Sequence, residues 1–279
     1  MMQVSYYPGC SLHGTASEYD ASTKAVSRLL GVELLELADW NCCGASSAHS
    51  TNESLAYELA ARNLAIAKRE GKDVVIPCAA CYSRLKAADS QDRKDQEGRK
   101  GEIEVLSLLE FLASRDRMEK IKQLRKRSLA GLKVVCYYGC LLVRPPRVTH
   151  SVNYENPQQM DRLMAALGAE AIPWSYKTDC CGASLALTRT DIVRRLTRKI
   201  LDGAQRAGAD AVVVACPLCQ ANLDTRQEEI SRESGQEYAL PILYFTELIG
   251  LALDHGDTGK WWKKHFVDPR KLFATKGFI

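Results

Sequence analysis

Short apolar runs alternate with longer mixed segments along the 279 residues of the chain. The runs "VSYY" and "VVCYY" are rich in β-formers and end close to a glycine, which is typical of strands that lead into turns. Two further apolar runs follow each of them. The predicted strands lie at 4–7, 33–37 and 74–76 in the first half and at 134–138, 170–174 and 211–215 in the second. Each half therefore predicts the same succession of strands.

The mixed segments between these runs predict helices. One helix ends at Gly31, and its counterpart is predicted to begin with Asn156 as the N-cap and Pro157 as the first helical residue. A second helix in each half, at about 51–70 or 190–207, ends before Gly71 or Gly208, where a left-handed residue is favoured. A third helix, a charged loop and a fourth strand–helix pair complete each half. We therefore predict an α/β fold of two tandem Rossmann-like units, each a mainly parallel four-stranded sheet flanked by helices.

Cysteines recur at matching places in the two halves. The pattern C-x31-CC-x34-CxxC in the first half returns as C-x39-CC-x34-CxxC in the second. Each cysteine group follows a predicted strand, so the fold should gather it at the carboxyl end of the sheet, where open α/β folds place their sites. The ten residues are Cys10, Cys42, Cys43, Cys78 and Cys81, and then Cys140, Cys180, Cys181, Cys216 and Cys219.

The duplication predicts four parts of the chain: a first unit at 1–115, a helical linker at 116–130, a second unit at 131–252 and a C-terminal tail at 253–279. Residues 115–127 carry seven basic and two acidic side chains, which indicates either a solvated linker or a docking face for an acidic partner. The tail is basic and aromatic, so it either packs on the body or covers a partner subunit. The polar stretches 88–102 and 224–237 are predicted to be exposed loops.

Composition narrows the function. The net charge of +4 gives no reason to expect nucleic-acid binding, and the N-terminus lacks the features of a signal peptide. No run of 18 or more apolar residues occurs, so we expect a cytoplasmic protein without membrane insertion. Eleven cysteines in a reducing compartment indicate metal binding or redox chemistry rather than a disulfide framework.

Several kinds of cysteine site are consistent with the sequence. Structural zinc needs only four ligands, and a thioredoxin-like CxxC would leave three cysteines of each set unused. A vicinal disulfide in either CC pair is strained and rare. Two unusual iron–sulfur sites account best for five thiols per set. Gly44 and Gly182 lack a Cβ, so we expect them to let the backbone approach the sulfides closely.

The repeated pattern, with its CCG motif, resembles the cysteine-rich CCG domain family. Together with "YYGCLLVRPP" at 137–146 and "KHFVDPR" at 264–270, it is most similar to the B subunit of heterodisulfide reductase. That resemblance implies a noncubane [4Fe–4S] cluster in each unit, held by the five cysteines of its set. It also implies that the S–S bond of a disulfide is split between the two clusters, and that electrons come from a C-type subunit with cubane clusters and a flavin-bearing A-type subunit. The chain itself has no GxGxxG flavin or nicotinamide motif and no CxxCxxC motif.

Two departures from the archaeal pattern bear on the reaction. Leu141 stands where archaeal members carry a histidine, which favours a bacterial relative with a different disulfide or sulfane-sulfur substrate. Cys136 matches Tyr6 of the first half, so it is predicted to be a buried thiol rather than a ligand. Three basic residues near the expected cluster edges are either binders of an anionic substrate or ordinary surface charges; they are Arg144, Arg147 and Lys177.

Three other functions remain open from the sequence. Similar subunits occur in bacterial complexes that oxidise sulfur bound to persulfides or lipoyl groups, so the reaction could run oxidatively. The chain could instead be an electron-transfer subunit, like the CCG proteins of lactate or glycerol-3-phosphate oxidation systems. A zinc-stabilised scaffold is the third possibility, and the absence of visible colour would reveal it.

Overall fold

The computed structural model describes residues 1–95 and 103–279, and it contains two four-stranded parallel sheets. The strands are β1 (Met2–Tyr6), β2 (Val32–Glu36), β3 (Val74–Ile76), β4 (Val105–Ser107), β5 (Lys133–Tyr137), β6 (Glu170–Ala171), β7 (Ala211–Val214) and β8 (Ile242–Tyr244). Their order is β2-β1-β3-β4 in one sheet and β6-β5-β7-β8 in the other, with every pair parallel. The identical order confirms the predicted duplicated α/β fold.

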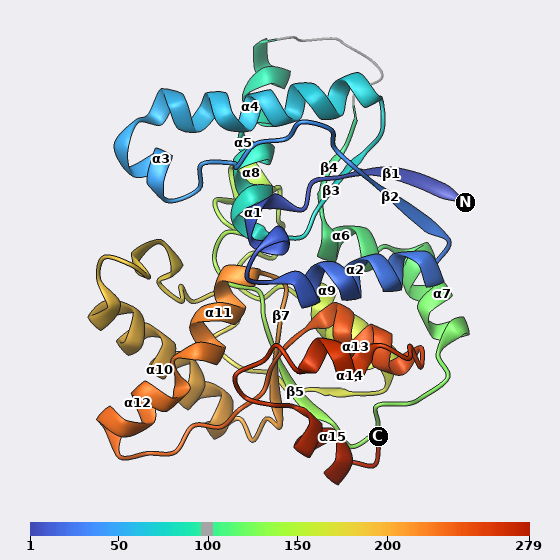
Figure 1. Ribbon diagram of the computed structural model, residues 1–279, viewed down its shortest axis with the longest axis vertical. Coiled ribbons are helices and arrows are strands. Elements are labelled where there is room, and N and C mark those ends of the chain that lie inside the picture. The colour runs from blue at the N-terminus through green and yellow to red at the C-terminus, as the bar shows by residue number, and fades with distance from the viewer. Residues whose placement is uncertain (96–102) are drawn as a thin grey trace.

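Helices cover both sheets and fill the space between them (Figure 1). In the first half they are α1 (Gly9–His13), α2 (Ser17–Leu29), α3 (Ser47–Thr51), α4 (Glu53–Glu70), α5 (Ala79–Asp95), α6 (Leu108–Leu112) and α7 (Arg115–Leu124). In the second they are α8 (Pro146–Thr149), α9 (Gln159–Leu167), the 3-10 helix η1 (Ala183–Leu185), α10 (Thr190–Arg206), α11 (Pro217–Thr225), α12 (Gln227–Ser234), α13 (Phe245–Ala252), α14 (Thr258–Trp262) and α15 (Arg270–Thr275). Among the described helices, none is long and apolar enough to cross a membrane.

Local signals account for the elements that position the cysteines. The β3 and β7 strands are fully buried apolar segments, as expected for parallel strands covered on both faces. Asn52 caps α4 by accepting a 3.0 Å hydrogen bond from the Leu55 N–H, and Gly71 ends the helix in the left-handed conformation. The β3 and β7 strands each lead into a loop or helix that carries cysteines.

The α9 helix begins later than the sequence predicted. It starts at Gln159 rather than Pro157, and the Asn156 side chain accepts a hydrogen bond from the Gln158 amide instead of capping the helix. The buried Tyr138 hydroxyl supplies the cap, because it accepts the Met160 N–H at 2.7 Å. A tertiary contact thus satisfies helix donors that the sequence assigned to a local cap.

The two polar stretches expected to be loops are largely helical. The α5 helix continues to Asp95, so only residues 96–102 of the first stretch lie outside the described residues. In the second stretch, α12 occupies Gln227–Ser234 and buries Ile230. Its other side chains are mostly polar, and a short amphipathic helix of this composition is easily mistaken for a loop.

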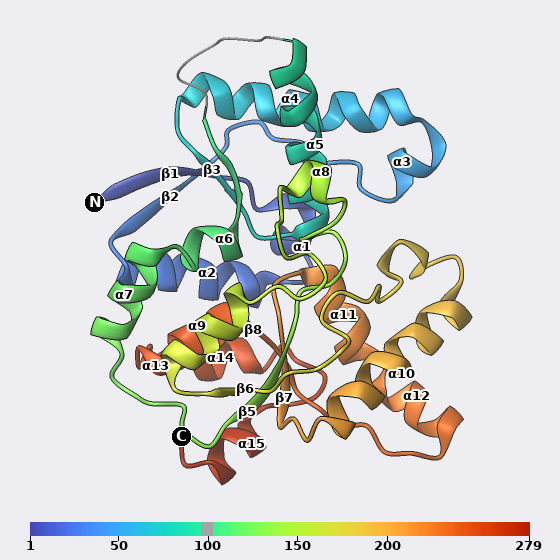
Figure 2. The ribbon, with the colours of Figure 1, turned by 180° about the vertical axis from the view of Figure 1, so that it is seen from behind.

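The α2 helix of the first half lies beside α13 of the second half in both ribbon views (Figures 1 and 2). Tyr19 on α2 stacks on Tyr244 with ring centroids 4.0 Å apart, and the hydroxyls of Ser22 and Thr246 lie 2.7 Å apart. The Tyr19 hydroxyl donates to the carbonyls of residues 77 and 215 at 3.4 Å each. These carbonyls immediately precede the two CxxC motifs, so one tyrosine ties both motifs together.

The basic segment and the tail are anchored to the body. Ile121 on α7 is fully buried, and Lys120 donates to the carbonyl of Leu30, although most of the basic side chains are exposed. In the tail, aromatic side chains enter the core, and His265 is buried. Of the two arrangements that the sequence allowed for the tail, packing on the body is therefore the one observed; the buried aromatic residues are Trp261, Trp262, Phe273 and Phe278.

Candidate metal centre and adjoining cavity

The first cysteine set converges from three loops that follow β1, β2 and β3. The Sγ atoms of Cys10 and Cys42 lie 3.8 Å apart, and those of Cys43 and Cys81 lie 3.3 Å apart. Cys10 and Cys42 are exposed, whereas the other three thiols are buried. Hydrogen bonds from Cys42 and Cys81 lower the pKa of Cys43 to about 3. The set therefore stabilises a thiolate, which is the form that binds metals.

The second set repeats this arrangement after β5, β6 and β7. The Sγ atoms of Cys181 and Cys219 lie 3.7 Å apart. A hydrogen bond from Cys140 lowers the pKa of Cys180 to about 6. As in the first set, one member of the vicinal pair is exposed and the other is buried. The topology thus brings together residues that lie 79 positions apart in the sequence, from Cys140 to Cys219.

The two sets meet at the boundary between the units. The Cys216 thiol is hydrogen-bonded by Cys219 and by Cys78 of the first unit, and these contacts lower its pKa. All eleven cysteines carry free thiols. The two thiol-rich sites are therefore in contact, because no intervening layer of protein separates Cys78 from Cys216.

A tyrosine positions the vicinal pair in each unit. The Tyr7 hydroxyl donates to the carbonyl of Asn41 at 2.7 Å, and the Tyr137 hydroxyl donates to the carbonyl of Asp179 at 2.5 Å. Each carbonyl belongs to the residue just before the CC pair. Burial raises the pKa of both tyrosines, so both remain donors that hold the pair in place.

Glycines approach the thiols, and they include two that the sequence did not indicate. Gly44 and Gly182 adopt positive φ, and a Cβ there would meet the side chains of Leu59 and Val193. The Gly182 N–H also donates to the Cys180 Sγ at 3.3 Å, so the backbone approaches sulfur here as expected. The glycines just before Cys10 and Cys140 also approach sulfur: a Cβ on Gly9 would lie 2.9 Å from the Cys81 Sγ, and one on Gly139 would lie 2.9 Å from the Cys219 Sγ. The glycine before the first cysteine of each set thus lies against the sulfur of the last one.

The arrangement of the thiols fits a group larger than one ion. Among the residues that the structure describes, no three Cys, His, Asp or Glu side chains converge on a single metal-ion position. Tetrahedral zinc requires four ligands around one point. Thiolates spread in pairs around a common space suit a cluster of several irons instead, because each iron takes its own ligand. The donor set, sulfur alone, is also typical of iron–sulfur sites.

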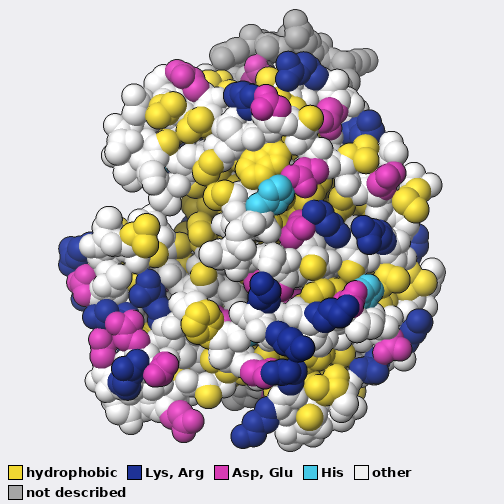
Figure 3. Space-filling view, viewed as in Figure 1, with side chains coloured by type: hydrophobic (Ala, Val, Ile, Leu, Met, Phe, Trp, Pro, Cys, Tyr) yellow, Lys and Arg dark blue, Asp and Glu magenta, His cyan; other side chains and the backbone are white. Residues whose placement is uncertain are grey.

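A cavity of about 250 Å³ opens beside the second set. All five cysteines of that set line it, and so do Leu141 and Ala183. The opposite wall comes from the first unit, through residues 45–50 and the start of α5. Figure 3 shows the surface hollowed between these two lobes, with hydrophobic side chains in its depth. The cavity is therefore completed by both units, and it gives a small molecule access to the thiols.

The basic residues that the sequence indicated do not line this cavity. Lys177 is buried in a 2.7 Å ion pair with Asp161, and Arg144 pairs with Glu155 at 2.6 Å. Both charges are therefore paired within the chain. Sequence reasoning missed Arg84 and His49, which do line the cavity, because no motif distinguishes them from ordinary helix and loop residues.

Cys136 lies in β5 and is fully buried, and burial raises its pKa well above the ordinary value of a thiol. Its backbone carbonyl accepts the Trp174 indole N–H at 2.9 Å. A neutral thiol inside the sheet agrees with the expectation that this eleventh cysteine is a core residue.

Comparison with known families identifies the family to which the chain belongs. A family model described as the CCG cysteine-rich domain matches the chain twice, at residues 4–86 and 134–224. The chain belongs to the CCG cysteine-rich domain family. Each matched region spans one cysteine set, so the two sheets described above are two CCG units in tandem.

Relatives of this CCG protein are components of redox enzymes. It is 33% identical to the "8-methylmenaquinol:fumarate reductase membrane anchor subunit" of Wolinella succinogenes, over 90% of this chain and 92% of the relative. It is 28% identical to the B subunit of the ferredoxin:CoB-CoM heterodisulfide reductase of Methanosarcina mazei, over 91% and 90%. The B subunit of the ferredoxin/F(420)H(2)-dependent CoB-CoM heterodisulfide reductase of Methanosarcina acetivorans is 29% identical, again over 91% and 90%. The predicted similarity to the B subunit of heterodisulfide reductase is confirmed.

A solved structure shares the fold of the CCG protein. A hypothetical protein from Helicobacter pylori superimposes with a TM-score of 0.75 at 12% identity, over 95% of this chain. The matched region is 52% of the Helicobacter chain, so this chain spans about half of that protein. At this identity the match concerns the fold alone.

Proposed function

We propose that this protein is the catalytic iron–sulfur subunit of a disulfide-reducing complex. The ten cysteines would hold two noncubane [4Fe–4S] clusters, one in each CCG unit. The observation that carries the proposal is the cavity of about 250 Å³, because all five cysteines of the second set line it and residues of the first unit complete it, so a cluster held there would face the space between the units. The ligand residues would be Cys10, Cys42, Cys43, Cys78 and Cys81 in the first unit, and Cys140, Cys180, Cys181, Cys216 and Cys219 in the second.

The reaction requires two electrons and two protons. A disulfide RSSR′ takes up two electrons and two protons as its S–S bond breaks, and RSH and R′SH leave. Bound iron–sulfur clusters supply electrons one at a time. Two sites joined through Cys78 and Cys216 therefore match the electron count of the reaction. The chain's own contribution is a cavity that holds the disulfide against the thiol-lined wall, with Leu141 and Ala183 limiting its width.

The electrons would come from partner subunits. The relatives are named as subunits of multi-component reductases, which supports membership of a complex. A C-type subunit with cubane clusters and a flavin-bearing A-type subunit are the partners that the family resemblance implies. The exposed basic side chains around α7 would suit an acidic face on one of them. We expect the complex to be cytoplasmic.

A second candidate function has its own support. The relative from Wolinella succinogenes is named as a fumarate reductase subunit rather than as a disulfide reductase. This chain could therefore pass electrons between partners without reducing a disulfide itself. Oxidation of persulfide-bound or lipoyl-bound sulfur is an oxidative alternative to the first function. The two candidates differ in one respect: only sulfur chemistry needs the cavity to be open.

Metal analysis tests the cofactor first. Protein purified without oxygen should contain about eight iron and eight sulfide per chain, the total for two four-iron clusters, with visible absorption and an EPR signal. Replacing Cys43 by Ser should remove about half of the iron, since its thiolate is the best-stabilised donor of the first set. Zinc without colour would overturn the cofactor assignment.

Disulfide turnover then tests the reaction. Wild-type protein with a reduced viologen dye as the one-electron donor should reduce a small disulfide. Ala183→Phe should lower this activity, because the new ring occupies the cavity, and the iron content of the variant distinguishes exclusion of the substrate from loss of the cluster. Leu187→Phe is the matched control, since Leu187 is 97% exposed on the same segment and does not line the cavity. The electron-transfer function would be favoured if wild-type protein with its clusters does not reduce the disulfide but passes electrons from the dye to a partner.

A further inference from the structure

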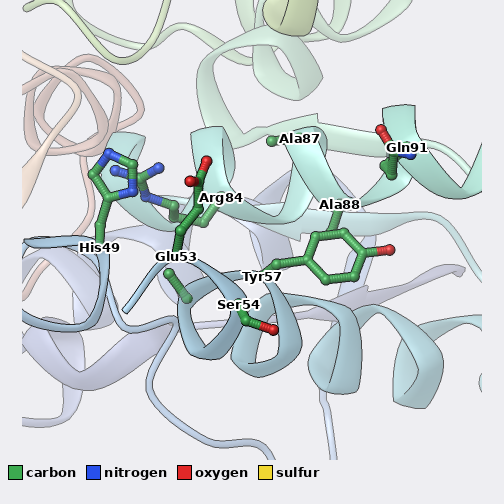
Figure 4. Close-up of a pocket in the computed structure, with 9 residues that line it drawn as sticks. His49, Glu53, Ser54, Tyr57, Arg84, Ala87, Ala88 and Gln91 are labelled. Carbon is green, nitrogen blue, oxygen red and sulfur yellow. The ribbon is translucent and has the colours of Figure 1, made fainter. Parts of the chain in front are cut away.

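The wall that the first unit contributes to the cavity carries a guanidinium group. Arg84 lies on α5, one turn after Cys81, and it lines the cavity beside the second cysteine set. It also lines an adjoining groove of about 440 Å³ between α4 and α5. Figure 4 shows Arg84 and His49 together at one end of this groove, and Tyr57 and Gln91 further along it. Arg84 therefore stands where the inner cavity meets the outer groove.

Arg84 has an unsatisfied donor. Its Nε atom is buried without a hydrogen-bond partner, and among the side chains described, those of residues 1–92 and 103–279, none forms an ion pair with it. A buried guanidinium donor without an acceptor costs free energy comparable to a lost hydrogen bond. The cationic group is planar and presents several donors, a geometry that matches carboxylates and other oxyanions. An unsatisfied arginine that faces a cavity thus indicates an anionic ligand.

The neighbouring groups determine where such an anion would lie. His49 lines both spaces and is exposed, and its side chain forms no hydrogen bond with the described residues. Glu53 lines only the outer groove, where its carboxylate would repel a negative ligand. The anion is therefore favoured on the inner side of Arg84, next to the thiols. The remainder of the groove offers Tyr57 and Ala88, which suit an uncharged chain.

We infer that Arg84 binds an anionic group of the disulfide substrate, with His49 as a second donor, while an uncharged part of the substrate extends along the groove between α4 and α5. The inference rests on the proposed function and names its substrate class: a disulfide that carries a carboxylate or a similar oxyanion a few bonds from sulfur. Because Arg84 belongs to the first unit and the cavity's thiols to the second, recognition depends on both units.

A different role for Arg84 makes distinct predictions. Its positive charge also lowers the pKa of Cys43, after the larger effects of the neighbouring thiols, so it lies close to the first cysteine set. If Arg84 served only to balance the charge of that set, its loss would affect all disulfides equally. If it binds the substrate, its loss affects only anionic disulfides. The charge of the probe therefore separates the two roles.

Binding of charged and neutral disulfides tests the inference. We would titrate oxygen-free, oxidised holoprotein by calorimetry, without reductant, with 3,3′-dithiodipropionate, bis(2-hydroxyethyl) disulfide and cystamine. These probes are similar in length and carry negative, zero and positive charge. The variants are Arg84→Gln, Arg84→Lys and, as a surface control, Arg69→Gln, because Arg69 is exposed on α4 and lines neither space. Iron content and circular dichroism establish that each variant is folded and loaded.

We expect wild-type protein to bind the dianionic probe at least tenfold more tightly than the neutral one, since a charge-assisted hydrogen bond distinguishes them. Arg84→Gln should remove this preference, Arg84→Lys should retain part of it, and Arg69→Gln should not change it. Equal binding of the two probes by the wild type would overturn the inference, as would equal weakening of both by Arg84→Gln. Calorimetry measures binding without turnover, so the two proposals can fail separately. An Arg84-dependent preference for the anionic probe, without dye-driven reduction of a disulfide, would refute the proposed reaction alone. Dye-driven reduction of a disulfide without a charge preference in binding would refute the inference alone.

Discussion

A buried ion pair fastens the C-terminal tail to the second CCG unit and should make stability depend on pH. The His265 Nε2 lies 2.9 Å from a carboxylate oxygen of Glu247, and both side chains are fully buried. The other Glu247 oxygen accepts the Tyr244 N–H at 2.9 Å. Glu18 from α2 and Asp224 from α11 also act on His265. The imidazole thus faces acidic groups from three helices.

The size of this effect on stability follows from the shift in the pKa of His265. Burial alone would lower the pKa of His265, but the charge of Glu247 and its hydrogen bond outweigh burial and raise the pKa from 6.5 to about 9. Such a shift corresponds to about 3 kcal/mol. A raised pKa in the folded state stabilises the protein fully below pH 6.5, and this contribution is lost as the pH rises through about 9. Stability should therefore fall on the alkaline side.

Denaturant unfolding of the oxygen-free holoprotein between pH 6 and pH 10 measures this effect. We compare wild type with His265→Gln at each pH, since the titration of other groups and the loss of any bound cofactor on unfolding are common to both. The difference in unfolding free energy should be largest, at about 3 kcal/mol, near pH 6 and should shrink toward pH 10. His13→Gln is the control, because its 2.9 Å contact with Glu36 is solvent-exposed and contributes little.

A constant difference between wild type and His265→Gln across this range would refute the reasoning, because it would mean that the imidazole stays neutral and acts only by packing. An equal pH dependence in His13→Gln and His265→Gln would also refute it. The reverse trend, with the difference growing toward pH 10, would show that burial outweighs Glu247 after all.

Further predictions concern the cysteine sets. Gly9→Ala should lower the iron content, because its Cβ would lie 2.9 Å from the Cys81 Sγ. Gly71→Ala is the control, because Gly71 also has a positive φ but no atom lies within 4 Å of the added Cβ. It should cost only about 1 kcal/mol of stability in denaturant unfolding. Tyr19→Phe should destabilise the protein by about 1 kcal/mol and change the magnetic coupling between the two sites in EPR, since it removes the hydroxyl that bridges the CxxC motifs; unchanged spectra would speak against that bridge. Cys136→Ser should leave iron content and activity unchanged, and lost iron would make Cys136 a ligand.

Much of the fold and of the cysteine grouping could be predicted from the spacing of residues in the sequence. The strand before Cys78 is a short apolar run flanked by turn residues, and Gly71 marks the end of the preceding helix, so both follow from local periodicity and backbone preference. The repeat of the cysteine pattern determined that there are two units, and the parallel connections determined that each set gathers at one edge of its sheet. These are properties of short segments and of their order, which the sequence states directly.

The tertiary structure decided what short segments cannot specify. Tyr138 caps a helix that begins 21 residues later in the sequence, at Gln159, and Tyr19 bridges two motifs from different units. Arg84 became a candidate for substrate binding only because α5 of the first unit faces the cysteines of the second. Such contacts depend on how two sheets and their helices pack together, and packing is set by side chains far apart in the chain. The sequence by itself thus determined the thiols and their grouping, whereas the relative position of the units decided that the two groups touch and that a cavity opens beside them.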